Sequence, residues 1–420
     1  MYAAMPAVLK AAVENAYIQC GWSLSTSTNK YGYDLFPCFT DLLESLRIII
    51  NDSDYSQEVK DNYTGSLITR VKSLTNGLNG QIFTANEIDS IKLFEESTIV
   101  DLSRIGSSET KSMIMGIIVM RLQEYRMSKG GINLPLKHVT VIEEAHNLLK
   151  RTSYEQSSES ANLLGKSVEM ISNAIAEMRT YGEGFVIVDQ APGLLDMSVI
   201  RNTNTKIIMH LPDMTDRELV GKSAGMSDDQ LMELAKIPAG VASVYQNRWI
   251  EPVLCHVDYY EVKPQKYLRK SQSILKMQDE GEVKQHIVKY LIALRNNNDC
   301  LVDMEKFEEY LVKSNLKASL KISILSLIKS DKEISKIAIE KLVCDLVDSD
   351  NRIFQKVKCV TDISEWNKAL IDNLEISTED LSTNNILNIL ECLIHYRSLG
   401  KDVAEENFLK WMKYMGRKVV

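Results

Sequence analysis

This chain of 420 residues is distinguished first by what it lacks. No apolar run approaches the roughly 18 residues of a membrane-spanning helix, and the N-terminus has no basic segment followed by an apolar one. The seven cysteines are odd in number and include no C-x-x-C pair, which argues against a disulfide framework and against a zinc site. These absences predict a cytoplasmic protein with reduced thiols and no membrane association.

A large excess of positive charge is missing as well. The formal net charge is -8 and the isoelectric point is about 5.5, which argues against a surface that binds nucleic acid over its whole extent. A local basic lining in a pore or groove remains compatible with these values. Hydrophobic residues make up 45% and charged residues 25%, which is ordinary for a globular protein, and the length suffices for two or three domains.

A phosphate-binding loop of the form G-x-x-x-x-G-K-[ST] is also absent from the 420 residues. Two Gly-Lys-Ser triplets occur, at 165–167 and 221–223, but Ser160 and Asp216 stand where the motif requires its first glycine. Both triplets fall inside predicted helices, whereas such a loop follows a strand and wraps phosphates with backbone N–H groups at a helix N-terminus. We therefore predict that neither triplet binds phosphate.

The most informative stretch that is present is HVTVIEEAH, at 138–146. It is a short β-branched run that predicts a buried strand, and it ends in the adjacent carboxylates Glu143 and Glu144. Open α/β sheets bind ligands at the carboxyl ends of their strands, and P-loop NTPases carry their Walker B acids there. The alternative is that these acids only begin a helix, where the helix dipole favours negative charge.

The pattern along residues 1 to about 260 alternates between helix and strand, which predicts an α/β fold with a mostly parallel sheet and flanking helices. A polar stretch at 152–160 predicts a loop. The predicted helices are 6–19, 40–50, 56–76, 109–125 and 163–179. The predicted strands are 97–102, 138–143, 184–190, 205–211, 242–245 and 252–257.

The composition changes from about residue 262 onward, where glycine and proline almost vanish. Apolar residues at helical spacing then predict an all-α C-terminal domain. We therefore divide the chain into residues 1–262, an α/β domain, and residues 263–420, a helical domain of unknown role. The predicted C-terminal helices are 282–294, 304–312, 318–328, 334–347 and 385–395.

Residues 1–262 resemble the later part of the HerA/FtsK superfamily of ring-forming P-loop ATPases, most closely the HerA-like branch. The matching stretches are VTVIEEAHNLLK, IAEMRTYGEGFVIVDQAPGLLD, VIRNTNTKIIMHLPDMTDRELVG and AKIPAGVASVYQNRWIEPVLCHV. The resemblance implies a RecA-like sheet that is incomplete at its N-terminus, because the family's P-loop lies upstream of the first helix seen here. The chain is therefore expected to be a C-terminal part, a subunit whose P-loop another polypeptide supplies, or a degenerate subunit.

The resemblance also implies roles for the two acids and for Gln190. Glu143 would bind the nucleotide's Mg²⁺ through water, and Glu144 would polarise the attacking water. Gln190 would sense the terminal phosphate of ATP, although a polar residue there can simply end a buried strand. Asp189 can be structural.

Two arginines complete the predicted site. The resemblance implies that Arg179 is an arginine finger that reaches the nucleotide of the next subunit. A cation at that position is also favourable merely because a helix ends there. Arg201 is a weaker candidate for nucleotide binding. His138 and His146 are interpreted as ordinary packing or capping residues and not as metal ligands.

The family resemblance implies a ring, usually a hexamer, that hydrolyses ATP between subunits and moves double-stranded DNA through its channel. A nuclease or another effector is a reasonable expectation for a partner. The alternative is a non-hydrolysing scaffold or regulatory subunit that keeps the fold for assembly with a partner.

Overall fold

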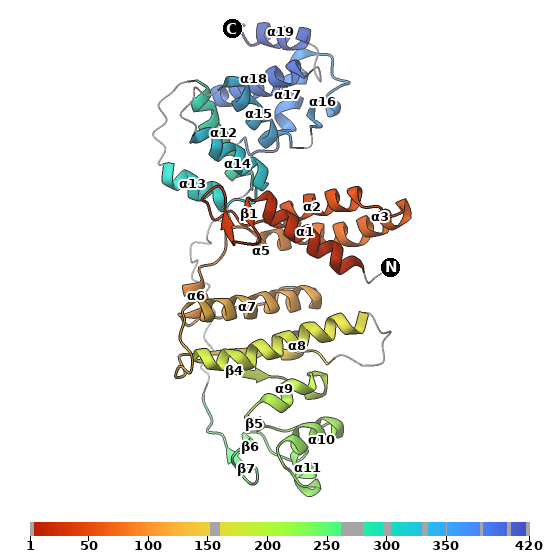
Figure 1. Cartoon of the computed structure of the whole chain (residues 1–420), viewed down its shortest axis with the longest axis vertical. Coiled ribbons are helices and arrows are strands. Elements are labelled where there is room, and N and C mark those ends of the chain that lie inside the picture. The colour runs from red at the N-terminus through yellow and green to blue at the C-terminus, as the bar shows by residue number, and fades with distance from the viewer. Residues whose placement is uncertain are drawn as a thin grey trace. The chain divides into compact units, whose positions relative to one another are not determined.

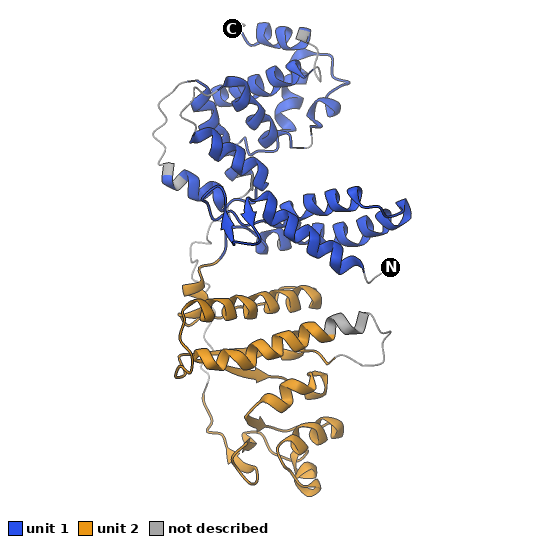
Figure 2. Ribbon diagram, viewed as in Figure 1, with its two compact units in different colours: residues 1, 3–87, 269–420 blue, residues 2, 88–268 orange. Residues whose placement is uncertain are grey.

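The computed structural model describes residues 4–151, 160–261, 280–296, 304–329, 335–349, 351–378, 381–400 and 405–416. The chain is mostly helical with small sheets, and it divides into two compact units (Figure 2). Unit 1 consists of Ala3–Glu87 and Arg269–Val420, and unit 2 consists of Ile88–Leu268.

The N-terminal segment of unit 1 groups with the C-terminal helices, which the division predicted at residue 262 did not anticipate. That predicted boundary and most of the predicted loop at 152–160 lie outside the described residues. One contact between the two segments is made by the buried side chain of Asp41, whose Oδ1 accepts a hydrogen bond from the Ala318 backbone N–H at 2.7 Å. An ion pair of 3.3 Å between Lys317 and Glu44 joins the same two segments.

Unit 1 is built of helices that bury an apolar core, in which helix α15 packs closely on α18 (Figure 1). The helices predicted for the C-terminal region are confirmed. The helices of this region are α12 (Glu280–Arg295), α13 (Met304–Val312), α14 (Ala318–Ile328), α15 (Lys336–Val347), α16 (Ile353–Lys356), α17 (Ile363–Asp372), α18 (Thr383–Leu399) and α19 (Glu405–Tyr414). The N-terminal segment contains α1 (Met5–Gln19), β1 (Trp22–Ser23), β2 (Thr28–Asn29), α2 (Phe39–Asp52), α3 (Gln57–Tyr63), η2 (Thr64–Ile68), α4 (Thr69–Leu74) and α5 (Gly77–Ile82).

Unit 2 contains the strands that carry the predicted site. Its elements up to the second strand are α6 (Ser90–Phe94), α7 (Ser108–Ser128), β3 (His138–Glu143), η3 (Ala145–Asn147), α8 (Ser160–Met178), η4 (Arg179–Tyr181) and β4 (Glu183–Val188). The remaining elements are η5 (Pro192–Leu194), α9 (Met197–Asn202), β5 (Thr205–Ile208), α10 (Met214–Ser223), α11 (Asp228–Leu234), β6 (Val241–Gln246) and β7 (Val253–His256).

The strands of unit 2 form two small sheets in the described part of the chain. Strands β3 and β4 pair in parallel, from His138 opposite Glu183 to Glu143 opposite Val188. Strands β5, β6 and β7 form a separate antiparallel sheet. The strand predicted at 97–102 is wrong: no strand forms there, and Ile99 is 94% exposed. A β-branched sequence is not enough to make a strand where no neighbouring strand supplies hydrogen bonds.

The two faces of the β3–β4 pair differ sharply. On one face, Ile142, Phe185 and Ile187 pack into a core with residues of α7 and α8, which lie alongside the sheet (Figure 1). The other face carries exposed valines. These are Val139, Val141, Val186 and Val188, which are 43–57% exposed. Apolar residues on both faces are typical of parallel strands that are covered on both sides.

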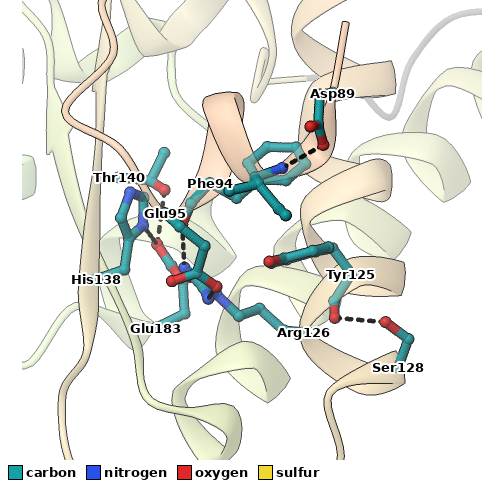
Figure 3. Close-up of polar contacts among 10 residues, drawn as sticks. Asp89, Phe94, Glu95, Tyr125, Arg126, Ser128, His138, Thr140 and Glu183 are labelled. Carbon is teal, nitrogen blue, oxygen red and sulfur yellow. Dashed lines mark hydrogen bonds and ion pairs between the residues drawn. The ribbon is translucent and has the colours of Figure 1, made fainter. Parts of the chain in front are cut away.

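A buried polar network joins the beginnings of β3 and β4 to two helices (Figure 3). The Glu183 carboxylate is fully buried, and it accepts hydrogen bonds from Arg126 Nε at 3.0 Å and Thr140 Oγ1 at 2.7 Å. His138 Nδ1 lies 2.7 Å from the same carboxylate. Arg126 also donates to the Phe94 backbone oxygen, so a single guanidinium connects α6, α7 and β4.

Candidate active site

The predicted acids and Gln190 meet at one edge of the parallel pair. Because Glu143 lies opposite Val188, the two strands end at the same level and their following residues come together. Gln190 Nε2 donates a hydrogen bond of 3.2 Å to Glu144 Oε1. The structure therefore places Glu144 and Gln190 in contact at the carboxyl ends of two parallel strands, where α/β proteins bind ligands.

The backbone of Glu144 is unusual. Its φ of 51° and ψ of 47° are left-handed, a conformation that non-glycine residues rarely adopt. Two hydrogen bonds stabilise this turn: the Asn147 backbone N–H and side-chain Nδ2 both donate to the Glu144 carbonyl oxygen, at 2.9 and 3.0 Å. Left-handed residues held in this way concentrate at active sites, where the conformation directs a side chain.

Asp189 and His146 also lie beside Glu144, although neither was among the site residues predicted from the sequence. Asp189 Oδ2 accepts a hydrogen bond from the His146 backbone N–H at 2.8 Å and lies 2.9 Å from His146 Nδ1. The other ring nitrogen, Nε2, lies 3.6 Å from Glu144 Oε2. The sequence signal for this pair was limited to position: Asp189 lies near the end of the predicted strand 184–190, and His146 lies three residues after the predicted strand 138–143.

Glu143 is exposed at the end of β3, on the same face as the exposed valines. No group of three or more His, Cys, Asp or Glu residues that could hold a metal ion occurs among the described residues. Mg²⁺ usually keeps several waters and binds one or two protein carboxylates together with substrate phosphates, so a single carboxylate such as Glu143 is compatible with it. Glu143 is therefore suited to hold such an ion only jointly with a phosphate ligand.

Arg179 is not brought to this site within the chain. It is exposed in η4, which precedes β4, whereas Gln190 follows β4. A strand of this length places the two residues roughly 20 Å apart at about 3.3 Å per residue. Arg179 and Gln190 therefore lie at opposite ends of β4.

Arg201 lies near the end of α9 and lines a surface pocket of about 840 Å³. Ala191, the residue after Gln190, is part of the same lining. Arg151 and Lys222 line the same pocket. Asp216 is also part of the lining, and its carboxylate accepts a hydrogen bond of 2.8 Å from the Gly193 backbone N–H. The pocket is thus close to the Glu144 site but mixed in charge.

The two Gly-Lys-Ser triplets lie in helices, as predicted. Residues 165–167 lie within α8 and residues 221–223 lie at the end of α10. Their backbone N–H groups are committed to helical hydrogen bonding, so they cannot form a phosphate-binding turn.

Comparison with known proteins gives distant relatives for part of this chain. No protein-family profile matches the chain. A protein of Sulfolobus acidocaldarius named DNA double-strand break repair helicase HerA is 23% identical over 231 residues, which are 53% of this chain and 44% of that relative. The protein of the same name from Sulfurisphaera tokodaii is 25% identical over 187 residues, or 43% of this chain and 35% of the relative. The one from Saccharolobus solfataricus is 29% identical over 143 residues, 34% of this chain and 26% of its own length.

These partial matches support a HerA-like relationship. The matched region spans less than half the length of each of these curated relatives. Within the described residues, no helix combines the length and apolar character needed to cross a membrane.

Proposed function

We propose that this chain is part of a HerA-like ATPase that hydrolyses ATP and processes double-stranded DNA. The observation that carries the proposal is the junction of Glu144 with Gln190 at the ends of two parallel strands, with Glu144 in a left-handed conformation. A carboxylate and an amide held together at such an edge can orient a water molecule for attack on a phosphate.

Each residue of the site has a role in this proposal. Glu144 polarises the attacking water, and Gln190 fixes the carboxylate and faces the terminal phosphate. Glu143 holds Mg²⁺ through water; when bound, that ion neutralises charge on the phosphates. Arg201 contributes positive charge on the neighbouring pocket.

Arg179 supports the proposal of a ring. Its position before β4 separates it from Glu144 in the same chain, so it would act as a finger only from an adjacent subunit. Head-to-tail contacts of this kind close into rings when the rotation between subunits allows it. We propose a homo-oligomeric ring, most simply a hexamer, with ATP bound between subunits.

The uncovered strands support the proposal that a RecA-like sheet is completed by a further segment. Strand β4 pairs only with β3, and β5 pairs only with β6, so each has one open edge among the described strands. The exposed valines of β3 and β4 also need a covering layer. A strand that leads into a phosphate-binding loop would pair with an open edge and supply the motif that the 420 residues lack, and the helix that follows such a loop could cover the exposed valines.

The DNA substrate is proposed from the relatives, whose names describe helicases that repair DNA double-strand breaks. Basic loops in a channel would bind phosphates without reading sequence. Repair of DNA ends requires strand cutting as well as movement, so a nuclease is the proposed partner. Such a role would place the protein in the cytoplasm.

The test is the variant Glu144→Gln in the longest natural form of the protein. Because the amide cannot accept the proton of water, we expect DNA-stimulated phosphate release to fall by at least about 100-fold while the variant remains folded. Glu251→Gln, an exposed residue between β6 and β7, is the control and should retain full activity. Unchanged phosphate release in Glu144→Gln would remove Glu144 from the mechanism.

The second candidate function is a non-hydrolysing scaffold that keeps the fold for assembly. The absence of a G-x-x-x-x-G-K-[ST] motif from the 420 residues favours it. On this account neither the wild type nor Glu144→Gln releases phosphate, whereas both assemble equally well with the partner. Measurement of oligomeric state beside phosphate release separates the two functions.

A further inference from the structure

We infer that the pair Asp189–His146 positions the water that Glu144 polarises, so that His146 and Asp189 are positioning residues of the site. The inference rests on the proposed function of Glu144. It gives a functional role to the side chains of His146 and Asp189, which lie after β3 and β4. Capping of a strand end or a turn alone would not require both of them.

The Asp189 carboxylate is firmly fixed. Its side chain is only 3% exposed, and both of its oxygens are occupied. Oδ2 receives the His146 backbone N–H and faces the ring, while Oδ1 accepts a hydrogen bond of 2.9 Å from the Ala191 backbone N–H. Because these donors come from the segments after β3 and after β4, the carboxylate locks the two strand ends together.

The ring of His146 is oriented by this carboxylate. A carboxylate accepts hydrogen bonds, so Nδ1 must carry the proton and donate to Asp189. The ring then presents Nε2 toward Glu144 Oε2, at 3.6 Å. On the other side, Gln190 holds Oε1 at 3.2 Å. The Glu144 carboxylate is thus flanked by an amide and an imidazole, each set by the end of a strand.

The separation of 3.6 Å is too long for a direct hydrogen bond but suits two groups that contact one water molecule. His146 Nε2 can accept a hydrogen bond from the water that Glu144 polarises, which restricts that water to one orientation. Correct orientation of the attacking group lowers the barrier of the reaction. Glu144 is half-exposed, and an Nε2 without a proton cannot donate to its carboxylate, so the imidazole acts through the water that the two groups share.

A purely structural role of His146 would require fewer of its polar atoms. Holding the turn requires only the His146 backbone N–H and the donor at Nδ1, both directed at Asp189. Positioning of the attacking water requires the far nitrogen, Nε2, as well. Asparagine at this position keeps a donor near Nδ1 and lacks the far nitrogen, whereas glutamine keeps a polar group near Nε2.

The test compares His146→Asn with His146→Gln in the form of the protein that hydrolyses ATP. We expect His146→Asn to lower kcat by roughly 10- to 100-fold with little change in KM, as is typical when a supporting partner of an active-site group is lost. His146→Gln should recover part of kcat, and Asp189→Asn should lower kcat as His146→Asn does. His256→Asn, an exposed histidine of β7, is the matched control and should behave as the wild type. Wild-type kcat in His146→Asn, or a larger loss in His146→Gln than in His146→Asn, would overturn the inference.

A second readout does not depend on hydrolysis. Long-range ¹H–¹⁵N NMR spectra of the full chain report which ring nitrogen of each histidine carries the proton, and His146→Gln identifies the His146 signals. We expect Nδ1 to be protonated and Nε2 bare in the wild type at pH 8, and a changed pattern in Asp189→Asn. An Nε2-protonated ring, or signals that Asp189→Asn leaves unchanged, would contradict the inference. If instead Glu144→Gln leaves phosphate release intact while these spectra are as expected, the proposed function fails and the geometry of the pair stands.

Discussion

The two units of this chain differ in how completely they bury their apolar residues. Unit 1 buries the apolar sides of its helices in two cores, and in the larger one Leu346, Ile389 and Trp411 are fully buried. Unit 2 covers one face of its parallel strands and leaves Val141 and Val186 exposed on the other. Overall hydrophobicity therefore does not distinguish the two units, whereas the exposed apolar face of β3 and β4 does.

The units nevertheless share one device, a buried carboxylate between an arginine and a histidine. In unit 1, Glu340 receives Arg295 Nη2 at 2.8 Å and lies 2.7 Å from His395 Nδ1. In unit 2, Glu183 receives Arg126 Nε and lies against His138. In unit 1 this device is added to an extensive apolar core, whereas in unit 2 it joins strands that lack one covering layer. We therefore expect unit 2 to depend on its network more heavily.

The largest predicted effect tests this dependence. Glu183→Leu should destabilise unit 2 by about 3–5 kcal/mol, because removal of one partner leaves the Arg126 guanidinium buried with only Glu95 to pair with. Amide hydrogen exchange of β3 and β4 in increasing urea measures the free energy of opening for unit 2 alone. Glu340→Leu is the matched control and should destabilise unit 1 while leaving β3 and β4 unchanged. A loss below about 1 kcal/mol in Glu183→Leu would show that the network contributes little.

A matched pair of isoleucines tests the difference in burial. Ile389 is fully buried in α18, and Ile389→Ala should destabilise unit 1 by about 2–5 kcal/mol through lost burial and the cavity left behind. Ile207 of β5 is 67% exposed, and Ile207→Ala should change the stability of unit 2 by no more than about 0.5 kcal/mol. Hydrogen exchange in urea measures both variants. A large loss in Ile207→Ala in the isolated chain would mean that the open strand is already covered, for example by another copy.

The sequence predicted the elements whose signals are local. Helical periodicity identified the C-terminal helices, and the β-branched run before Glu143 identified β3. The predicted parallel sheet also implied that Glu144 and Gln190 lie at the same edge. In the structure the two side chains are hydrogen-bonded. The roles of Glu143, Glu144, Arg179, Gln190 and Arg201 stay predictions.

The features that the sequence missed depend on contacts between distant residues. The strand at 97–102 needed a neighbour that the described residues do not provide. The grouping of the N-terminal segment with the C-terminal helices includes a contact of Asp41, whose carboxylate accepts a hydrogen bond from the first residue of a helix that begins 277 residues later. The contact of Asp189 with His146 joins residues 43 apart, and neither side chain is unusual in isolation. No local pattern encodes such pairings.

The smallest predicted effect concerns thiol chemistry and not stability. In unit 1, burial raises the pKa of Cys20 to about 12, and burial also raises the pKa of Cys344. The thiolate is the reactive form, so at pH 8 both thiols should resist a thiol reagent until unit 1 unfolds. Cys255 of β7, which is only half-buried in unit 2, and the exposed Cys359 should be labelled first. Mass spectrometry of labelled peptides over time gives the order, and Cys359 controls for the reagent. If Cys20 reacted as fast as Cys255 in the folded chain, the core of unit 1 would open as readily as the uncovered strands of unit 2, and the contrast between the units would not hold in solution.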